Sequence, residues 1–175
     1  LYLLGAYTGL RRGDFLHLYE NNLVVEDGYE IIVKENQKTD KTTRIPVHQV
    51  VRDIMIRCGG KFPAEVNENY FNERIKKIGR LAGIVDPVSI KRTQGGQRVT
   101  RTSDKCDWMA SHTARRSFAT NAWLAGVPIE DISHILGHCS IQQTENYIKL
   151  TELQRAVKIA KHPWFQGRAQ MKKVS

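Results

Sequence analysis

The 175-residue sequence lacks most features that mark secreted, membrane or disulfide-linked proteins. Its three cysteines, Cys58, Cys106 and Cys139, lie far apart and form no C-x-x-C pair, which argues against a disulfide framework and favours reduced thiols in the cytosol. The sequence contains no signal peptide and no apolar run of membrane-spanning length, so membrane insertion is not expected. Internal repeats and low-complexity segments are also missing. We therefore expect a single domain with one sizeable core.

Acidic residues are fewer than basic ones. The chain has 27 lysines plus arginines against 18 aspartates plus glutamates, a formal charge of +9. This excess fits a merely basic surface, but it favours a polyanionic partner, because phosphate neutralisation drives sequence-independent nucleic-acid binding. The chain opens on an apolar stretch, residues 1–4, without an initiator methionine. That beginning suggests a piece of a longer protein.

The pattern of apolar and turn-forming residues predicts a mainly helical α+β fold. Three antiparallel strands are expected at 23–26, 29–34 and 42–46, the first two joined by the turn dipeptide Asp27-Gly28. A second hairpin is expected from 88–93 and 98–102. Helices are predicted at 1–8, in a short segment after Gly9, and at 50–58, 68–81, 140–150 and 151–161. Two more are predicted to begin at Ser111 and at Pro128. Ser140 and Gln143 are expected to form a capping box at the start of the 140–150 helix. In the 68–81 helix the expected apolar stripe is Phe71, Ile75, Ile78 and Leu81 or Ala82.

Three short segments, far apart in the chain, carry the residues with the most distinctive chemistry. They are Thr8-Gly9-Leu10-Arg11, Ser111-His112-Thr113-Ala114-Arg115, and Leu136-Gly137-His138 with Tyr147 nine residues later. Guanidinium groups can hold the charged oxygens of a phosphoryl transition state, and a tyrosine can attack where positive charge stabilises its phenolate. The set therefore suits in-line attack on a phosphodiester.

In their order and spacing these segments resemble the catalytic domain of the tyrosine recombinases, the phage integrase family. That family has an arginine in a T-G-L-R turn, a lysine on a β-hairpin, an H-x-x-R helix, an L-G-H turn and a downstream tyrosine. The resemblance extends from about residue 1 to about residue 161. The matching residues are Arg11, Lys38, His112, Arg115, His138 and Tyr147.

The resemblance implies an integrase-type catalytic domain with a small three-stranded antiparallel sheet and an additional β-hairpin. Residues 1–175 would form this single domain. The DNA-binding domain that precedes it in the family, and the first helix of the catalytic domain, would be absent from the fragment.

The resemblance also implies a transesterification that uses neither metal nor cofactor. Tyr147 would attack a DNA phosphate, giving a 3′-phosphotyrosyl link and a free 5′-hydroxyl. Arg11 and Arg115 would stabilise the developing charge, and His138 would add a hydrogen bond. Only the family pattern selects Arg11 over its neighbour Arg12.

Three further residues would assist this reaction. His112 would help proton transfer, because its titration lies near neutral pH. Lys38, at a hairpin tip, would protonate the leaving 5′ oxygen, although Lys34 and Lys41 are competitors within reach. Asp14 stands where the family usually has glutamate, and we expect it to orient an arginine by a salt bridge.

Simpler interpretations compete with these roles. His134 and His138 are four residues apart, a spacing used for zinc, and Cys139 is adjacent. However, Gly137 is expected to end the helix between the two rings, and no fourth ligand is evident, so we predict no metal site. Tyr147, one turn from the end of its predicted helix, would by periodicity alone be a core residue.

Basic residues outside the constellation are candidate DNA contacts. On one helix, Arg115 borders the apolar stripe, whereas Arg116 is expected to point toward solvent as a DNA-backbone contact or a surface residue. The second hairpin is either a solvated edge ribbon or a contact to the DNA backbone. Its basic residues are Lys91, Arg92, Arg98 and Arg101.

The function implied by the resemblance is site-specific recombination of double-stranded DNA by the integrase of a mobile element, in the bacterial cytoplasm with the nucleoid. Four protomers would assemble on two DNA sites by exchanging C-terminal segments, for which 151–161 and Trp164-Phe165 are candidates. Two alternatives remain: a type IB topoisomerase-like nicking-closing enzyme, and a non-catalytic helix-turn-helix DNA-binding protein built on residues 119–147.

Overall fold

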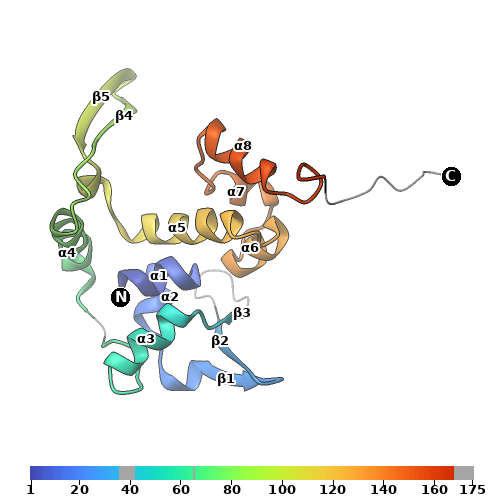
Figure 1. The fold of residues 1–175 in the computed structure, drawn as a ribbon. Helices are drawn as coiled ribbons and strands as arrows, with labels where there is room; N and C mark the ends of the chain where they lie inside the picture. Colours follow the sequence, from blue (N-terminus) through green and yellow to red (C-terminus); the bar gives the residue numbers. More distant parts are fainter. Residues whose placement is uncertain (36–41, 65, 168–175) are drawn as a thin grey trace.

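A computed structural model describes residues 1–35, 42–64 and 66–167 of the chain (Figure 1). The side chains of Glu68, Asn69 and Arg92 are also outside the described part. Lys38, the predicted general acid, lies outside it altogether. The observed architecture is the mainly helical α+β arrangement that the sequence predicts, with one three-stranded and one two-stranded antiparallel sheet. In the part of the chain that is described, no helix is both long and apolar enough to cross a membrane.

The first third of the chain surrounds the three-stranded sheet. Its strands are β1 (Leu23–Glu26), β2 (Tyr29–Glu35) and β3 (Thr42–Pro46), in that spatial order. Asp27 and Gly28 take positive φ values of 49° and 78° and form the tight turn that their dipeptide predicts. The helical elements beside the sheet are α1 (Tyr2–Thr8), α2 (Arg12–Leu16), η1 (Glu20–Asn22) and α3 (Gln49–Arg57).

The middle of the chain forms an arm at one side of the molecule (Figure 1). It comprises α4 (Glu68–Leu81), β4 (Pro87–Gln94), β5 (Gln97–Asp104) and η2 (Lys105–Trp108). The β4–β5 hairpin, whose strands are longer than predicted, projects beyond α4. The prediction of an apolar stripe along α4 is wrong for the second half of the helix. Phe71 and Ile75 are buried, but Ile78 and Leu81 are 61% and 89% exposed. Only the first half of α4 packs on the body, where Phe71 meets Phe15 at 5.6 Å between ring centroids.

The last third is helical. It consists of α5 (Ser111–Leu124), α6 (Ile129–Leu136), α7 (Ile141–Glu145) and α8 (Glu152–Ala160). The predicted 140–150 helix is too long, since α7 ends at Glu145 and Tyr147 lies in the turn that follows. The capping box expected there does not form. Ser140 makes no side-chain cap, and the Gln143 side chain instead accepts the Cys139 N–H at 3.3 Å.

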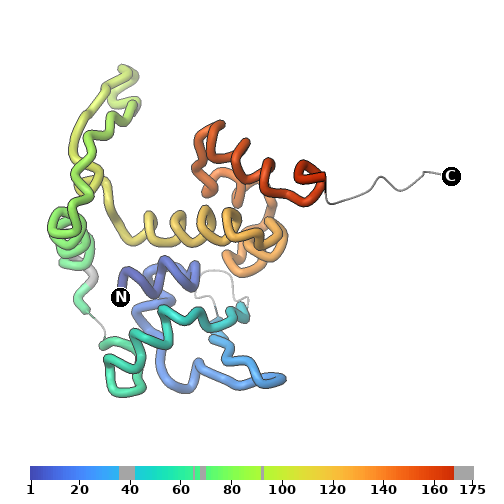
Figure 2. The backbone as a smooth tube through the Cα atoms, in the orientation of Figure 1, coloured from blue at the N-terminus to red at the C-terminus, as the bar shows by residue number. Residues whose placement is uncertain are grey.

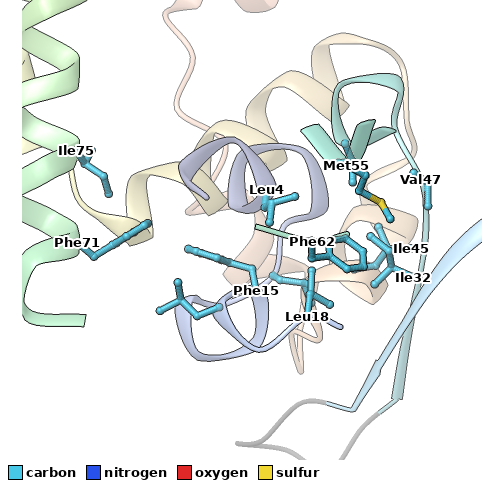
Figure 3. Packing of buried hydrophobic residues seen from close by; sticks show 13 residues of the cluster. Leu4, Phe15, Leu18, Ile32, Ile45, Val47, Met55, Phe62, Phe71 and Ile75 are labelled. Carbon is cyan, nitrogen blue, oxygen red and sulfur yellow. The ribbon is translucent and has the colours of Figure 1, made fainter. Parts of the chain in front are cut away.

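Two buried clusters hold the chain together. The larger lies among α1, α2, α3, the sheet and the start of α4 (Figure 3), and the smaller among α5, α6 and Ile148. Helix α1 lies along α5, so the first and last thirds of the chain meet directly (Figure 2). Gly5 permits this approach, because a Cβ there would come within 2.9 Å of Phe15 and 3.1 Å of Ala114.

Gly9 ends α1 in the left-handed conformation and is tightly enclosed. A Cβ at Gly9, whose φ is 69°, would lie 2.6 Å from Phe118, whereas one at Gly83, whose φ is 73°, would meet nothing within 4 Å. Both alanine variants suffer backbone strain, but only Gly9→Ala also overpacks the core. We expect Gly9→Ala to lower the free energy of unfolding by about 1–3 kcal/mol more than Gly83→Ala, as measured by urea denaturation. Equal losses would show that the turn is not tightly packed.

Candidate active site

The α1–α2 junction places Arg11 at the edge of a cleft. The left-handed Gly9 turns the chain, and Arg11 then takes an extended conformation as the N-cap of α2. Thr8 is buried beneath the turn, where its hydroxyl donates to the Leu4 carbonyl at 2.6 Å and accepts the Leu10 N–H at 3.3 Å. Because the turn is held from below, its arginine can project away from the core.

A pocket of about 510 Å³ opens beside this turn. It is formed by the T-G-L-R turn, the start of α5, the turn after α6 and the end of α7. Five of the six predicted catalytic residues line this pocket, and the sixth, Lys38, lies outside the described residues. The lining residues are Leu10, Arg11, Arg12, Ser111, His112, Arg115, His138, Gln143, Asn146 and Tyr147.

Arg115 connects the segments around the pocket. It is only 3% exposed, and its Nη1 donates to the Gly9 carbonyl at 2.5 Å while its Nη2 donates to the Leu136 carbonyl. These two acceptors belong to the T-G-L-R and L-G-H turns, and Arg115 itself belongs to the H-x-x-R helix. One guanidinium group therefore ties all three sequence segments together. A lysine has no fork with which to make both bonds at once.

The two arginines of the site lie close enough for one to affect the other. Burial lowers the pKa of Arg115 to about 10 and the nearby charge of Arg11 adds to this lowering, while Tyr147 and Asp14 oppose it. Arg115 remains a cation at neutral pH. Asp14 is only 2% exposed, and its charge raises the pKa of Arg115. Its salt bridge to an arginine stays a prediction. Among the described residues, the buried Nη1 of Arg11 and Nε of Arg115 have no hydrogen-bond partner.

The ring of Tyr147 is surrounded by basic side chains. His112 and His138 meet it edge-on, with ring centroids 5.0 Å and 4.7 Å away. The guanidinium carbons of Arg115 and Arg116 each lie 5.9 Å from its centroid. Tyr147 is partly buried and lines the pocket, so it is not a sealed core residue.

Both histidines are held toward the neutral form. Burial, followed by the charges of Arg115, Arg11 and His112, lowers the pKa of His138 to about 4. Burial, followed by the charges of Arg116 and Arg115, also lowers the pKa of His112. The Nδ1 of His138 hydrogen-bonds the buried Thr144 hydroxyl at 2.9 Å, which leaves Nε2 for another partner.

The pocket is chemically suited to an oxyanion. Two guanidinium groups line it, together with imidazoles that are held toward the neutral form and can donate or accept a proton. Within 1–35, 42–64 and 66–167, no three His, Cys, Asp or Glu side chains gather so as to hold a metal ion. Gly137 ends α6 in the left-handed conformation as predicted, and His134 is exposed whereas His138 turns into the pocket.

The sequence profile of the phage integrase family matches residues 1–154. The chain belongs to the phage integrase family. No curated protein sequence matched it. Within the family fold, the segments that converge on the pocket are those that carry the arginine, histidine and tyrosine motifs.

Solved structures of recombinases and integrases share the fold. The post-cleavage complex of the XerH site-specific recombinase with palindromic difH superposes with a TM-score of 0.61 at 15% identity, over 91% of this chain and 44% of that one. The Tn1549 transposon integrase with circular intermediate DNA gives 0.58 at 14% identity, over 92% and 57%. The catalytic domain of bacteriophage HP1 integrase gives 0.52 at 22% identity, over 97% and 83%. The chain thus spans about half the length of the XerH and Tn1549 proteins.

One expectation for this integrase-family site is wrong. Arg116 does not point to solvent: it is partly buried, its Nε is enclosed, and its guanidinium group turns over Tyr147. Arg115, expected at the border of the apolar stripe, is buried and bonded to two backbone carbonyls. For Arg116, helical periodicity gave the direction of the Cβ but not the path of a long side chain.

The other predicted residues lie apart from the pocket. Lys91, Arg98 and Arg101 are exposed on the β4–β5 hairpin, and Arg101 stacks over Trp108 at 5.8 Å. Arg92 pairs with Val99 in the hairpin, but its side chain lies outside the described part. Lys34, a competitor of Lys38, donates to the His17 carbonyl at 2.7 Å and is thereby engaged.

Several pocket residues were missed by sequence reasoning. Ser111, Gln143 and Asn146 line the pocket, and Thr144 fixes the ring of His138. The signal for Thr144 was its position three residues before Tyr147. Gln143 and Asn146 carry no motif, and only the tertiary fold brings them to the site.

The lowered pKa of His138 predicts how stability depends on pH. Because the pKa is about 4 in the folded protein and near 6.5 when unfolded, the unfolded chain binds more protons between these values. The free energy of unfolding should therefore fall as pH drops from about 6.5 to about 4, and His138→Gln should flatten this dependence. Urea denaturation followed by tryptophan fluorescence at several pH values measures it. The exposed control His134→Gln should keep the wild-type slope, and an unchanged slope in His138→Gln would contradict the assignment.

Proposed function

We propose that the chain is the catalytic domain of a site-specific DNA recombinase, the integrase of a mobile element, which cleaves and rejoins double-stranded DNA through a 3′-phosphotyrosyl intermediate. The observation that carries this proposal is the enclosure of Tyr147 by two histidines and two arginines at an open, oxyanion-compatible pocket. Family membership and the fold shared with XerH and the Tn1549 integrase support it.

In the proposed reaction a scissile phosphate occupies the pocket. Arg11 and Arg115, which both line the pocket, donate charge-assisted hydrogen bonds to its non-bridging oxygens. The Tyr147 oxygen attacks phosphorus, forming the P–O bond to tyrosine while the bond to the 5′ oxygen breaks. The chemical energy of the diester is kept, so a 5′-hydroxyl from another duplex can reverse the step.

Proton transfers accompany this exchange. Neutral His112, at the edge of the phenol ring, accepts the phenolic proton. The Nδ1 of His138 accepts a hydrogen bond from the Thr144 hydroxyl, and its Nε2 donates to a phosphate oxygen. Lys38 serves as the acid that protonates the leaving 5′ oxygen. Every group in this scheme belongs to the chain, and neither a metal nor a cofactor is required.

DNA binding and assembly are further parts of the proposal. The hairpin residues Lys91, Arg98 and Arg101 are exposed on an arm that extends from the body, which suits contacts to the phosphate backbone (Figure 1). Helix α8 has no buried residue and leaves Leu153 73% exposed, and Phe165 beyond it is 64% exposed. These exposed apolar side chains suit exchange of C-terminal segments within a homotetramer on two DNA sites. The proposed place of action is the bacterial nucleoid, where such DNA lies.

Two alternative functions can be separated from recombination by experiment. A type IB topoisomerase-like enzyme would relax supercoiled plasmid without a second target site, whereas a recombinase needs two. A non-catalytic DNA-binding protein, using α5 and α6 as a helix-turn-helix, would form no covalent adduct. The basic enclosure of a pocket-lining tyrosine favours an enzyme over this last function.

Covalent trapping tests the proposed chemistry even though the target sequence is not defined. The chain is mixed with nicked suicide duplexes of randomised sequence, and adducts are isolated on denaturing gels and digested for mass spectrometry. We expect nucleotide to be attached to Tyr147, because attack from that oxygen leaves the 3′-phosphate on tyrosine. Tyr147→Phe should form no adduct while DNA binding is retained, and the exposed control Tyr29→Phe should form it normally. An adduct that persists in Tyr147→Phe would refute the nucleophile.

Salt dependence tests the hairpin contacts. Arg98→Gln combined with Arg101→Gln should weaken duplex binding and reduce the slope of log K against log salt by up to about 0.9 for each phosphate that is no longer neutralised. Fluorescence anisotropy at several salt concentrations measures this slope. The matched pair Arg52→Gln with Arg57→Gln removes two charges from α3, far from the hairpin (Figure 1). Equal effects of the two pairs would mean that the hairpin contributes only net charge.

A further inference from the structure

Arg116 occupies an unexpected place beside the predicted nucleophile. Its Nε is buried and has no hydrogen-bond partner among the described residues, and its guanidinium carbon lies 5.9 Å from the Tyr147 ring centroid. Arg115 lies at the same distance from that ring. Unlike Arg115, Arg116 is not among the residues that line the pocket. It is therefore placed to act on the tyrosine rather than on a phosphate in the pocket.

The position of Arg116 also affects the proposed proton acceptor. After burial, the charge of Arg116 is the largest cause that lowers the pKa of His112, ahead of Arg115. His112 in turn meets the Tyr147 ring edge-on at 5.0 Å. Arg116 thus influences both partners of one proton transfer, the phenol that loses the proton and the imidazole that accepts it.

We propose that Arg116 is a positioning residue for the nucleophile: its guanidinium group holds the Tyr147 ring beside His112 and stabilises the phenolate that forms during attack. A cation over an aromatic ring is attracted by the ring quadrupole, and the attraction is stronger when the cation is shielded from water, as the buried Nε indicates. This inference rests on the proposed function. It assigns a role to a residue that the H-x-x-R pattern does not include.

Charged and titratable side chains reach the surroundings of His112 from four segments of the chain. Arg115 and Arg116 face it from α5 itself, His138 from the turn after α6, and Tyr147 from the turn after α7. Arg11 and Arg12, at the start of α2, line the same pocket. Loss of Arg116 leaves the other cations in place, so the change in His112 can be assigned to this one residue.

The test compares Arg116→Gln and Arg116→Lys with the control Arg57→Gln, which removes an exposed charge from the end of helix α3. The rate of single-turnover cleavage of a suicide DNA substrate is measured, as formation of the covalent adduct, at saturating protein from about pH 5 to 9. We expect Arg116→Gln to slow cleavage about tenfold, in line with loss of a shielded cation–π contact. DNA affinity should stay within about threefold of wild type, because Arg116 contacts tyrosine and not the pocket phosphate.

The pH profile provides the readout that a merely structural role would not change. Cleavage needs neutral His112 and is lost as pH falls through its pKa. Without the charge of Arg116 this pKa rises, so the acid limb should move to higher pH in Arg116→Gln and return toward wild type in Arg116→Lys. Histidine NMR titration of the free protein gives the same pKa change without requiring cleavage.

The possible outcomes separate the hypotheses. If Arg116→Gln weakens DNA binding but cleaves normally once bound, with an unchanged acid limb, Arg116 is a backbone contact and the proposal is wrong. A slower rate with an unchanged His112 pKa in the NMR titration would also overturn it, since only packing would have changed. Failure of the wild type to form any tyrosine adduct would instead refute the proposed function, and the NMR titration would still decide the electrostatic role of Arg116.

Discussion

The site depends on one buried guanidinium group. Arg115 donates to the carbonyls of Gly9 and Leu136, which lie 106 and 21 residues away along the chain. A buried donor and a buried backbone carbonyl are each unfavourable without a hydrogen-bond partner, so each of these two bonds pairs one donor of Arg115 with one carbonyl of a turn. Together the two bonds fix the T-G-L-R turn, the H-x-x-R helix and the L-G-H turn relative to one another. The pocket is the space that these three segments leave at their junction.

The same arrangement brings positively charged side chains close together, which favours the binding of an anion. Burial and then the charge of Arg11 lower the pKa of Arg115, while Tyr147 and Asp14 raise it. Burial, followed by the charges of Arg115 and Arg11, lowers the pKa of His138 to about 4, so this histidine is neutral at pH 7. A phosphate entering the pocket would lie beside both guanidinium groups and would reduce the repulsion between their charges.

Local structure was largely predictable from the sequence, whereas long-range side-chain contacts were not. The Asp27-Gly28 turn and the strands around it follow from local pattern, as do the bounds of α4, and the resemblance to the family indicated five residues that line one pocket. The exposure of Ile78 and Leu81 was not predictable, because periodicity does not tell where a partner surface ends. The position of the Arg116 guanidinium group over Tyr147 was not predictable either, because the conformation of a flexible side chain depends on contacts that only the tertiary fold provides.

The central claim is that segments distant in sequence form one oxyanion site at Tyr147, and anomalous diffraction from crystals grown with tungstate tests it most directly. Tungstate mimics the shape and charge of a phosphate, and its binding does not depend on a particular DNA target. We predict a tungsten peak within the pocket, in hydrogen-bonding reach of Arg11 and Arg115 and facing the Tyr147 oxygen. Tungsten bound only along the hairpin or elsewhere on the basic surface, with none in the pocket at saturating tungstate, would contradict this claim.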